Sequence, residues 1–153
     1  MKSLSPAIQY GIYSFVGIGI FFLLMKAFGL ENVAFLRVFN LLIIFYFSNR
    51  LARINAQENT SDQYLKSFAS LFLANAITVI LSVFSFAIYV SFIDVDFLSR
   101  FEGGILFAKH ITLGQALASV VLEGMAGSLI VSYTLMQYWK DVKPKAKIEV
   151  SKV

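Results

Sequence analysis

Four long apolar blocks, separated by short polar segments, dominate the pattern of this 153-residue chain. They cover about residues 7–28, 31–49, 62–93 and 111–139. A helix that crosses a bilayer needs about 20 residues at about 1.5 Å each, and all four blocks approach or exceed that length. The pattern predicts an all-α integral membrane protein with one domain, a bundle of four transmembrane helices, followed by a short tail over 140–153.

Turn and capping residues mark the ends of these blocks. Gly29 and Asn32 supply turn chemistry after the first block. The second block, which is the shortest, is expected to stop at the sequence NRLAR. Thr60 and Gln63 have the spacing of a capping box at the start of the third block. The third and fourth helices are long enough to tilt or to protrude from the bilayer.

Composition agrees with a membrane protein and excludes several kinds of chemistry. Hydrophobic residues make up 58% of the chain and charged residues 14%, against about 45–50% and about 25% in soluble domains. There is no cysteine, which excludes disulfides and thiolate sites. The sequence has no phosphate-binding loop, GxSxG, HExxH or dinucleotide fingerprint. We therefore expect no enzymatic activity, no cofactor and no metal site.

Basic residues gather on one side of the predicted bundle, which sets its orientation. Nine belong to the side that carries the termini: Lys2, Arg50, Arg53, Lys66, Lys140, Lys143, Lys145, Lys147 and Lys152. Four belong to the other side: Lys26, Arg37, Arg100 and Lys109. The positive-inside rule then predicts that both termini are cytoplasmic. The net charge of +4 thus reports orientation rather than nucleic-acid binding.

The basic tail, with Lys140, Lys143, Lys145 and Lys147, has two interpretations. The first is a tail that orients the protein and faces anionic lipid headgroups, since each juxtamembrane lysine adds about 1 kcal/mol of attraction. The second is a binding segment for a cytoplasmic partner.

Small and polar residues recur at helical spacing inside two of the apolar blocks. The third block carries Ser67, Ala74, Asn75, Thr78, Ser82, Ser85 and Tyr89 on one face. The fourth carries Gln115, Ser119, Glu123, Gly127, Thr134 and Gln137. Lipid tails are as apolar as leucine, so close packing and hydrogen bonds, rather than a hydrophobic force, hold membrane helices together. These faces are predicted to be packing seams, with a hydrophilic path as the alternative.

Depth places several of these side chains near one another. Counted from the cytoplasmic ends at about 1.5 Å per residue, Asn40 and Asn75 come at roughly 14 Å, Arg37 and Thr78 at roughly 18 Å, and Ser82 and Glu123 at roughly 24 Å. We therefore predict one buried intramembrane polar cluster made of Arg37, Asn40, Asn75, Thr78, Ser82 and Glu123.

The ionisable pair in this cluster is open to three hypotheses. A lone charge near the membrane centre costs about 2.5–3.5 kcal/mol on insertion scales, so a pairing partner is expected. Arg37 and Glu123 form a structural ion pair in the first hypothesis. In the second, Glu123 is protonated and bonded to Ser or Asn while Arg37 extends outward. In the third, the two residues form a proton or ligand site.

Small residues around Glu123 are candidate helix-packing positions. Gly124 with Ser128, and Gly114 with Ala118, have the small-xxx-small spacing that lets a neighbouring helix approach closely, and Gly127 lies beside them. The spacing serves an internal bundle and an oligomer interface equally well.

Four stretches together resemble a known family, domain-of-unknown-function 4199, whose members are small four-helix membrane proteins mainly from Bacteroidota. The stretches are LRVFNLLIIFY, YLKSFASLFLANAI, YVSFIDVDFL and LEGMAGSLIVSYTLMQYWK, and the resemblance runs from about Gln9 to Lys140. It implies a bacterial inner membrane, cytoplasmic termini, and Asn40, Phe92, Asp94 and Glu123 as family-like positions. The long acidic external insert of many members is nearly absent here, and the family brings no established activity.

Three function classes follow from these observations. The leading hypothesis is a non-enzymatic accessory or scaffolding subunit of the bacterial inner membrane, which binds a second copy of itself or other membrane-protein subunits through its small-residue seams. The second is a small proton- or anion-coupled transporter or channel-like protein that uses the Arg37–Glu123 layer. The third is lipid or quinone binding in an aromatic groove, since the chain has sixteen phenylalanines.

Overall fold

The computed structural model describes residues 5–30, 36, 38–57, 63–100 and 112–139. All regular structure in these ranges is helical, which confirms the all-α prediction. In chain order the elements are α1 (Pro6–Ala27), α2 (Val38–Asn55), α3 (Gln63–Ile88), the π-helical turn η2 (Tyr89–Ile93), the short α4 (Phe97–Arg100) and α5 (Leu113–Trp139).

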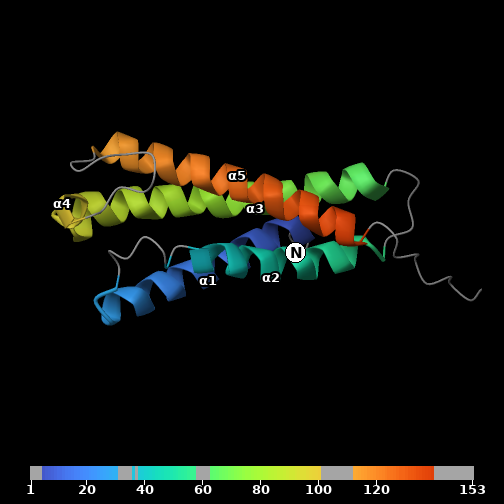
Figure 1. Ribbon diagram of the computed structural model, residues 1–153, viewed down its shortest axis with the longest axis horizontal. Coiled ribbons are helices and arrows are strands. Elements are labelled where there is room, and N and C mark those ends of the chain that lie inside the picture. Colours follow the sequence, from blue (N-terminus) through green and yellow to red (C-terminus); the bar gives the residue numbers. More distant parts are fainter. Residues whose placement is uncertain (1–4, 31–35, 37, 58–62, 101–111, 140–153) are drawn as a thin grey trace, which may run out of the picture.

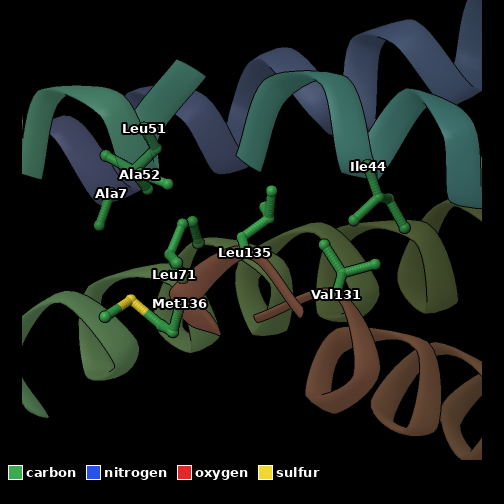
Figure 2. Packing of buried hydrophobic residues seen from close by; sticks show 9 residues of the cluster. Ala7, Ile44, Leu51, Ala52, Leu71, Val131, Leu135 and Met136 are labelled. Carbon is green, nitrogen blue, oxygen red and sulfur yellow. The ribbon is translucent and has the colours of Figure 1, made fainter. Parts of the chain in front are cut away.

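The four long helices pack lengthwise, and successive ones run in opposite directions (Figure 1). The start of α1 lies beside the end of α2 and the end of α5. Figure 2 shows this end of the bundle, where Ala7 packs among Leu51, Ala52, Leu71 and Met136. Helix α3 contacts all three of the other long helices, and it packs most extensively against α1 and α5. It is therefore the central element of the bundle.

Three segments of the described chain are long and apolar enough to cross a membrane: Pro6–Ala27, Tyr64–Ile93 and Leu113–Trp139. They identify the chain as a membrane protein. Helix α2 does not reach the same apolarity, because its 18 residues include Asn40, Asn49, Arg50, Arg53 and Asn55.

This bundle buries several polar side chains in its interior and leaves many large apolar side chains exposed. Large apolar side chains point outward, and Phe92, Ile130 and Leu23 are each more than 60% exposed. Asn75 and Ser132, in contrast, are at most 1% exposed. Soluble proteins bury their apolar side chains first. The apolar exterior suits a bundle surrounded by lipid, where the outer surface must be apolar and the buried polar groups must be satisfied inside.

Helix α2 continues beyond its predicted end at residue 49, passes through NRLAR and stops at Asn55. Burial explains the extension. Leu51 and Ala52 are buried against the core, whereas Arg50 and Arg53 on the other side are exposed. This segment is an amphipathic helical end rather than a stop. The predicted start of the block at residue 31 lies outside the described residues.

Helix α5 begins at Leu113 because a capping box precedes it. The Thr112 backbone N–H donates to Gln115 Oε1 at 3.0 Å, and the Gln115 backbone N–H donates to Thr112 Oγ1 at 3.3 Å. The two side chains thereby satisfy N–H groups that a helix start leaves without intrahelical partners. Gln115, which the sequence placed on a polar face, thus serves as a cap.

Glycines set the closest helix approaches. A Cβ atom added at Gly11 would lie 2.6 Å from the Ala74 carbonyl oxygen, so α1 and α3 meet there backbone to backbone. A Cβ added at Gly19, eight residues further along α1, would meet no atom of the described part of the chain within 4 Å. Gly11 is therefore required for packing and Gly19 is not.

This difference predicts opposite outcomes for two substitutions in the same helix. We expect Gly11→Ala to lower the free energy of unfolding in detergent by about 1–3 kcal/mol, because α1 must move away from α3 to relieve the overlap. Gly19→Ala, the matched control, is expected to leave it unchanged or to raise it by up to about 1 kcal/mol, because alanine has the higher helix propensity. Equal effects in SDS-titration unfolding curves would contradict the close approach at Gly11.

Candidate functional site

Asn75 joins three helices through two buried hydrogen bonds. Ser48 Oγ on α2 donates to Asn75 Oδ1 at 2.8 Å, and Asn75 Nδ2 donates to Ser132 Oγ on α5 at 3.3 Å. All three side chains are at most 2% exposed. Both functions of the amide are therefore satisfied, the carbonyl oxygen by one neighbouring helix and the amino group by the other.

Thr78 extends the same network to the fourth helix. Its Oγ1 lies 2.9 Å from the Gly11 carbonyl oxygen on α1 and 3.1 Å from the Ala74 carbonyl oxygen one turn before it on α3. A single hydroxyl hydrogen is shared between these two acceptors. Asn75 and Thr78, one turn apart on α3, thus connect that helix to α1, α2 and α5. We call Ser48, Asn75, Thr78 and Ser132 the polar hub.

Asn40 and Ser82, also predicted for this cluster, lie further along the bundle. Asn40 is eight residues from Ser48 and Ser82 is seven from Asn75, in the direction away from the chain termini. Both are therefore about 11–12 Å beyond the Ser48–Asn75 bond. Asn40 Oδ1 and Ser82 Oγ are buried and make no hydrogen bond with the part of the chain that the structure describes.

Glu123 lies outside the bundle rather than within it. Its side chain is exposed, and its Oε1 accepts a hydrogen bond from Ser119 Oγ at 3.2 Å, one turn earlier on α5. The prediction of a buried Glu123 was wrong because the inward face of α5 is formed by Gly127, Ser128 and Ser132, and Glu123 falls at the edge of that face. Its predicted partner Arg37 lies outside the described residues.

The small residues of α5 divide into two groups. A Cβ at Gly124 would lie 2.7 Å from Val79 Cγ2, and one at Gly127 would lie 2.7 Å from Leu41 Cδ2. Ser128 is fully buried. These three form the seam against α2 and α3. Gly114 and Ala118 are exposed, and a Cβ at Gly114 would meet none of the described residues within 4 Å, so this pair takes no part in the seam.

A second polar cluster lies at the end of the bundle away from the chain termini. Lys26 Nζ, at the end of α1, donates to the Tyr89 hydroxyl and lies 3.8 Å from Asp94 Oδ2. The Tyr89 hydroxyl lies 3.2 Å from the same carboxylate oxygen. Tyr89 is the first residue of the π-helical turn and Asp94 follows its last, and Phe22 and Phe97 pack edge-on against the Tyr89 ring. The cluster therefore fastens α1 to the end of α3.

Hydrogen bonds also join the helix ends at the side of the chain termini. Trp139 Nε1 donates to Asn49 Oδ1 at 2.9 Å, which joins the end of α5 to α2. Gln137 Nε2 donates to the Tyr64 hydroxyl at 3.2 Å, which joins α5 to the start of α3. The tail lysines predicted here, Lys140, Lys143, Lys145 and Lys147, lie outside the described residues.

Sequence reasoning missed the two serines that complete the polar hub, Ser48 and Ser132. A signal was present for Ser132, which follows Ser128 by four residues and therefore shares its face. Ser48 stood at the presumed end of its block, where a polar residue needs no explanation. Among the described residues, no group of three Asp, Glu, His or Cys side chains comes close enough to hold a metal ion.

Comparison with known proteins adds no further information, since no protein family model, curated protein or solved structure matches the chain. The resemblance described above therefore stays a prediction. Of its family-like positions, Phe92 is exposed, and Asp94 contacts Lys26 and Tyr89.

The polar hub predicts a large effect for Asn75→Ala. The substitution removes two hydrogen bonds, leaves Ser48 and Ser132 without the amide, and opens a gap in a closely packed interior. Because interhelical hydrogen bonds in membranes average about 0.6 kcal/mol each, we expect a total loss of about 1–3 kcal/mol in the free energy of unfolding. Ser85→Ala, at an exposed position of the same helix, is the control and is expected to be neutral. A neutral Asn75→Ala variant would overturn the role of the hub.

Proposed function

We propose that the chain is a four-span protein of the bacterial inner membrane with both termini in the cytoplasm. It acts as a non-enzymatic accessory or scaffolding subunit that associates with a second copy of itself or with other membrane-protein subunits. The proposal has two parts, the topology and the association, and different observations support each.

The packing of α2 supports a fourth membrane span. Helix α2 contacts α1, α3 and α5, and its Ser48 is buried in the interior, where it donates to Asn75 as part of the polar hub. At about 1.5 Å per residue its 18 residues measure about 27 Å, close to the roughly 30 Å of a hydrocarbon core. Arg50 and Arg53 lie in its last turns, where long side chains reach the headgroups.

The positions of charged and aromatic side chains support cytoplasmic termini. Arg50, Arg53 and Lys66 are exposed at the end of the bundle where α1 begins and α5 ends. Trp139 and Tyr64 lie at the same end and form the hydrogen bonds described above. Basic residues favour the cytoplasmic side, and both aromatic types favour the headgroup level.

Single cysteines test the topology cleanly, because the chain has none of its own. In intact cells we expect Ser5→Cys and Gln57→Cys to resist a membrane-impermeant maleimide until the membrane is opened. Val95→Cys, exposed at the other end, is expected to react at once. If α2 did not cross, Gln57→Cys and Ser5→Cys would react from opposite sides, and four spans would be excluded.

Exposed Glu123 is the observation that carries the proposed association. It lies in the middle of α5, and the exposed residues Ala126, Ile130 and Thr134 follow it at helical spacing on the same flank. A carboxyl group facing lipid at this depth is costly even when protonated, and among the described residues it accepts a single bond, from Ser119. A partner helix on this flank removes the group from lipid and supplies further hydrogen bonds.

The association predicts that Glu123→Ala weakens self-association by at least about tenfold, because the interface loses its polar contact. Glu123→Gln keeps the hydrogen-bonding groups and is expected to associate like the unaltered protein. Leu122→Ala, exposed on an adjacent flank, is the control. The measurements are native mass spectrometry and co-purification from the native membrane. Monomers without any bound subunit, for the unaltered protein, would refute the proposal.

A transport function is the second candidate, and the buried oxygens of Asn40 and Ser82 favour it. Both are in the interior near the level of Glu123, and polar groups of this kind often bind buried water. Transport predicts that Glu123→Gln or Arg37→Gln abolishes proton-coupled flux into liposomes while assembly is intact. Loss of assembly without any flux in the unaltered protein favours the accessory function instead.

A further inference from the structure

An apolar groove runs along the outside of the bundle between α1 and α2. Its volume is about 340 Å³, and its walls are almost wholly apolar. It is lined by Gly17, Phe21, Phe39, Leu42, Ile43, Tyr46 and Phe47. The α2 residues recur at spacings of three and four, so the groove follows one face of that helix for about 12 Å.

Gly17 brings the two helices together at the floor of the groove. A Cβ at this position would lie 2.9 Å from Ile43 Cγ2 and 3.3 Å from Phe47 Cε2. Phe21 and Phe39 pack 5.9 Å apart, centroid to centroid, across the same two helices. The rim is open to the outside, since Leu42 is 60% exposed and Tyr46 54%. The groove is therefore shaped for an elongated apolar chain that approaches from the surrounding lipid.

One end of the groove carries a positive charge. Arg50, one turn beyond Tyr46 on α2, donates from Nη2 to the Tyr46 hydroxyl at 3.2 Å, and its guanidinium lies 5.6 Å from the centroid of that ring. The arginine side chain is thereby directed back along the helix toward the groove. One of its five N–H donors is used by Tyr46, and the fork matches the geometry of a phosphate.

We propose that this groove binds one acyl chain of an anionic phospholipid, with the phosphate group held by Arg50. The charge at one end and the apolar walls along two turns match the two halves of such a molecule. Arg50 lies at the end of α2, where the headgroups are expected, and the groove extends from there toward the membrane centre. The inference rests on the proposed placement of the bundle in a membrane, and not on the association through Glu123.

The charged end is tested with Arg50→Gln and with Arg53→Gln as its matched control. Both arginines are exposed and lie three residues apart on α2, and Arg50 is the one that donates to Tyr46, a residue that lines the groove. Binding of phosphatidylglycerol and phosphatidylcholine to the delipidated protein is measured by native mass spectrometry in detergent. We expect Arg50→Gln to weaken phosphatidylglycerol binding about fivefold and phosphatidylcholine binding less, because the choline cation already offsets the charge of its phosphate group. Arg53→Gln is expected to change both by less than about twofold. Equal losses for the two variants would overturn the proposal.

The apolar part is tested with Leu42→Trp, which places a large ring in the groove at an already exposed position. We expect it to weaken binding of both lipids while the thermal unfolding temperature stays the same. Unchanged lipid binding would overturn the proposal. So would a loss of self-association in Leu42→Trp without a change in lipid binding, because a second copy would then be the occupant. Arg50→Gln is expected to self-associate normally, which separates failure of this site from failure of the association through Glu123.

Discussion

The absence of a hydrophobic force between helices in lipid is the constraint on which this bundle depends. Apolar side chains gain nothing by leaving a lipid tail for a neighbouring leucine, so polar bonds and close contacts must select the helix partners. Asn75 meets this requirement with a single side chain. It accepts from α2 and donates to α5, while Thr78, one turn away, bonds to α1. The position of α3 at the centre of the fold follows from these bonds.

Close packing and hydrogen bonding are interdependent at this point. Thr78 reaches the Gly11 carbonyl because α1 comes within contact distance of the α3 backbone, and it does so because Gly11 has no side chain. The shared hydroxyl also bonds to Ala74, whose carbonyl oxygen limits the approach. In a bilayer the close packing at Gly11 and the hydrogen bond of Thr78 each add little stability. Because both occur at the same level of the bundle, together they make the pairing of α1 with α3 specific.

The sequence predicted which faces of the helices carry polar groups. It did not predict which residues of those faces a neighbouring helix covers. Asn75, Thr78 and the Gly127–Ser128 seam followed from periodicity, because a residue's face depends only on its spacing from its neighbours. The exposure of Glu123 did not follow, because Glu123 lies at the edge of the inward face of α5. How much of such an edge a neighbour covers depends on the angles at which the helices cross. The extension of α2 to Asn55 was missed because the buried Leu51 lies between Arg50 and Arg53 in the sequence, and two arginines there indicated the end of an apolar helix.

Charge divides the polar residues of the bundle into two classes with different roles. The hub uses neutral side chains, Ser, Thr and Asn, whose donors and acceptors are satisfied by one or two bonds from neighbouring helices. The ionisable groups Lys26, Arg50 and Glu123 lie at the ends or on the outer surface. A charge needs more compensation than two hydroxyl groups provide, so burying it in the hub costs more stability than the bonds return. The interior therefore holds the fold together with neutral groups, and the contacts proposed with lipid and with other subunits use the outer charged positions.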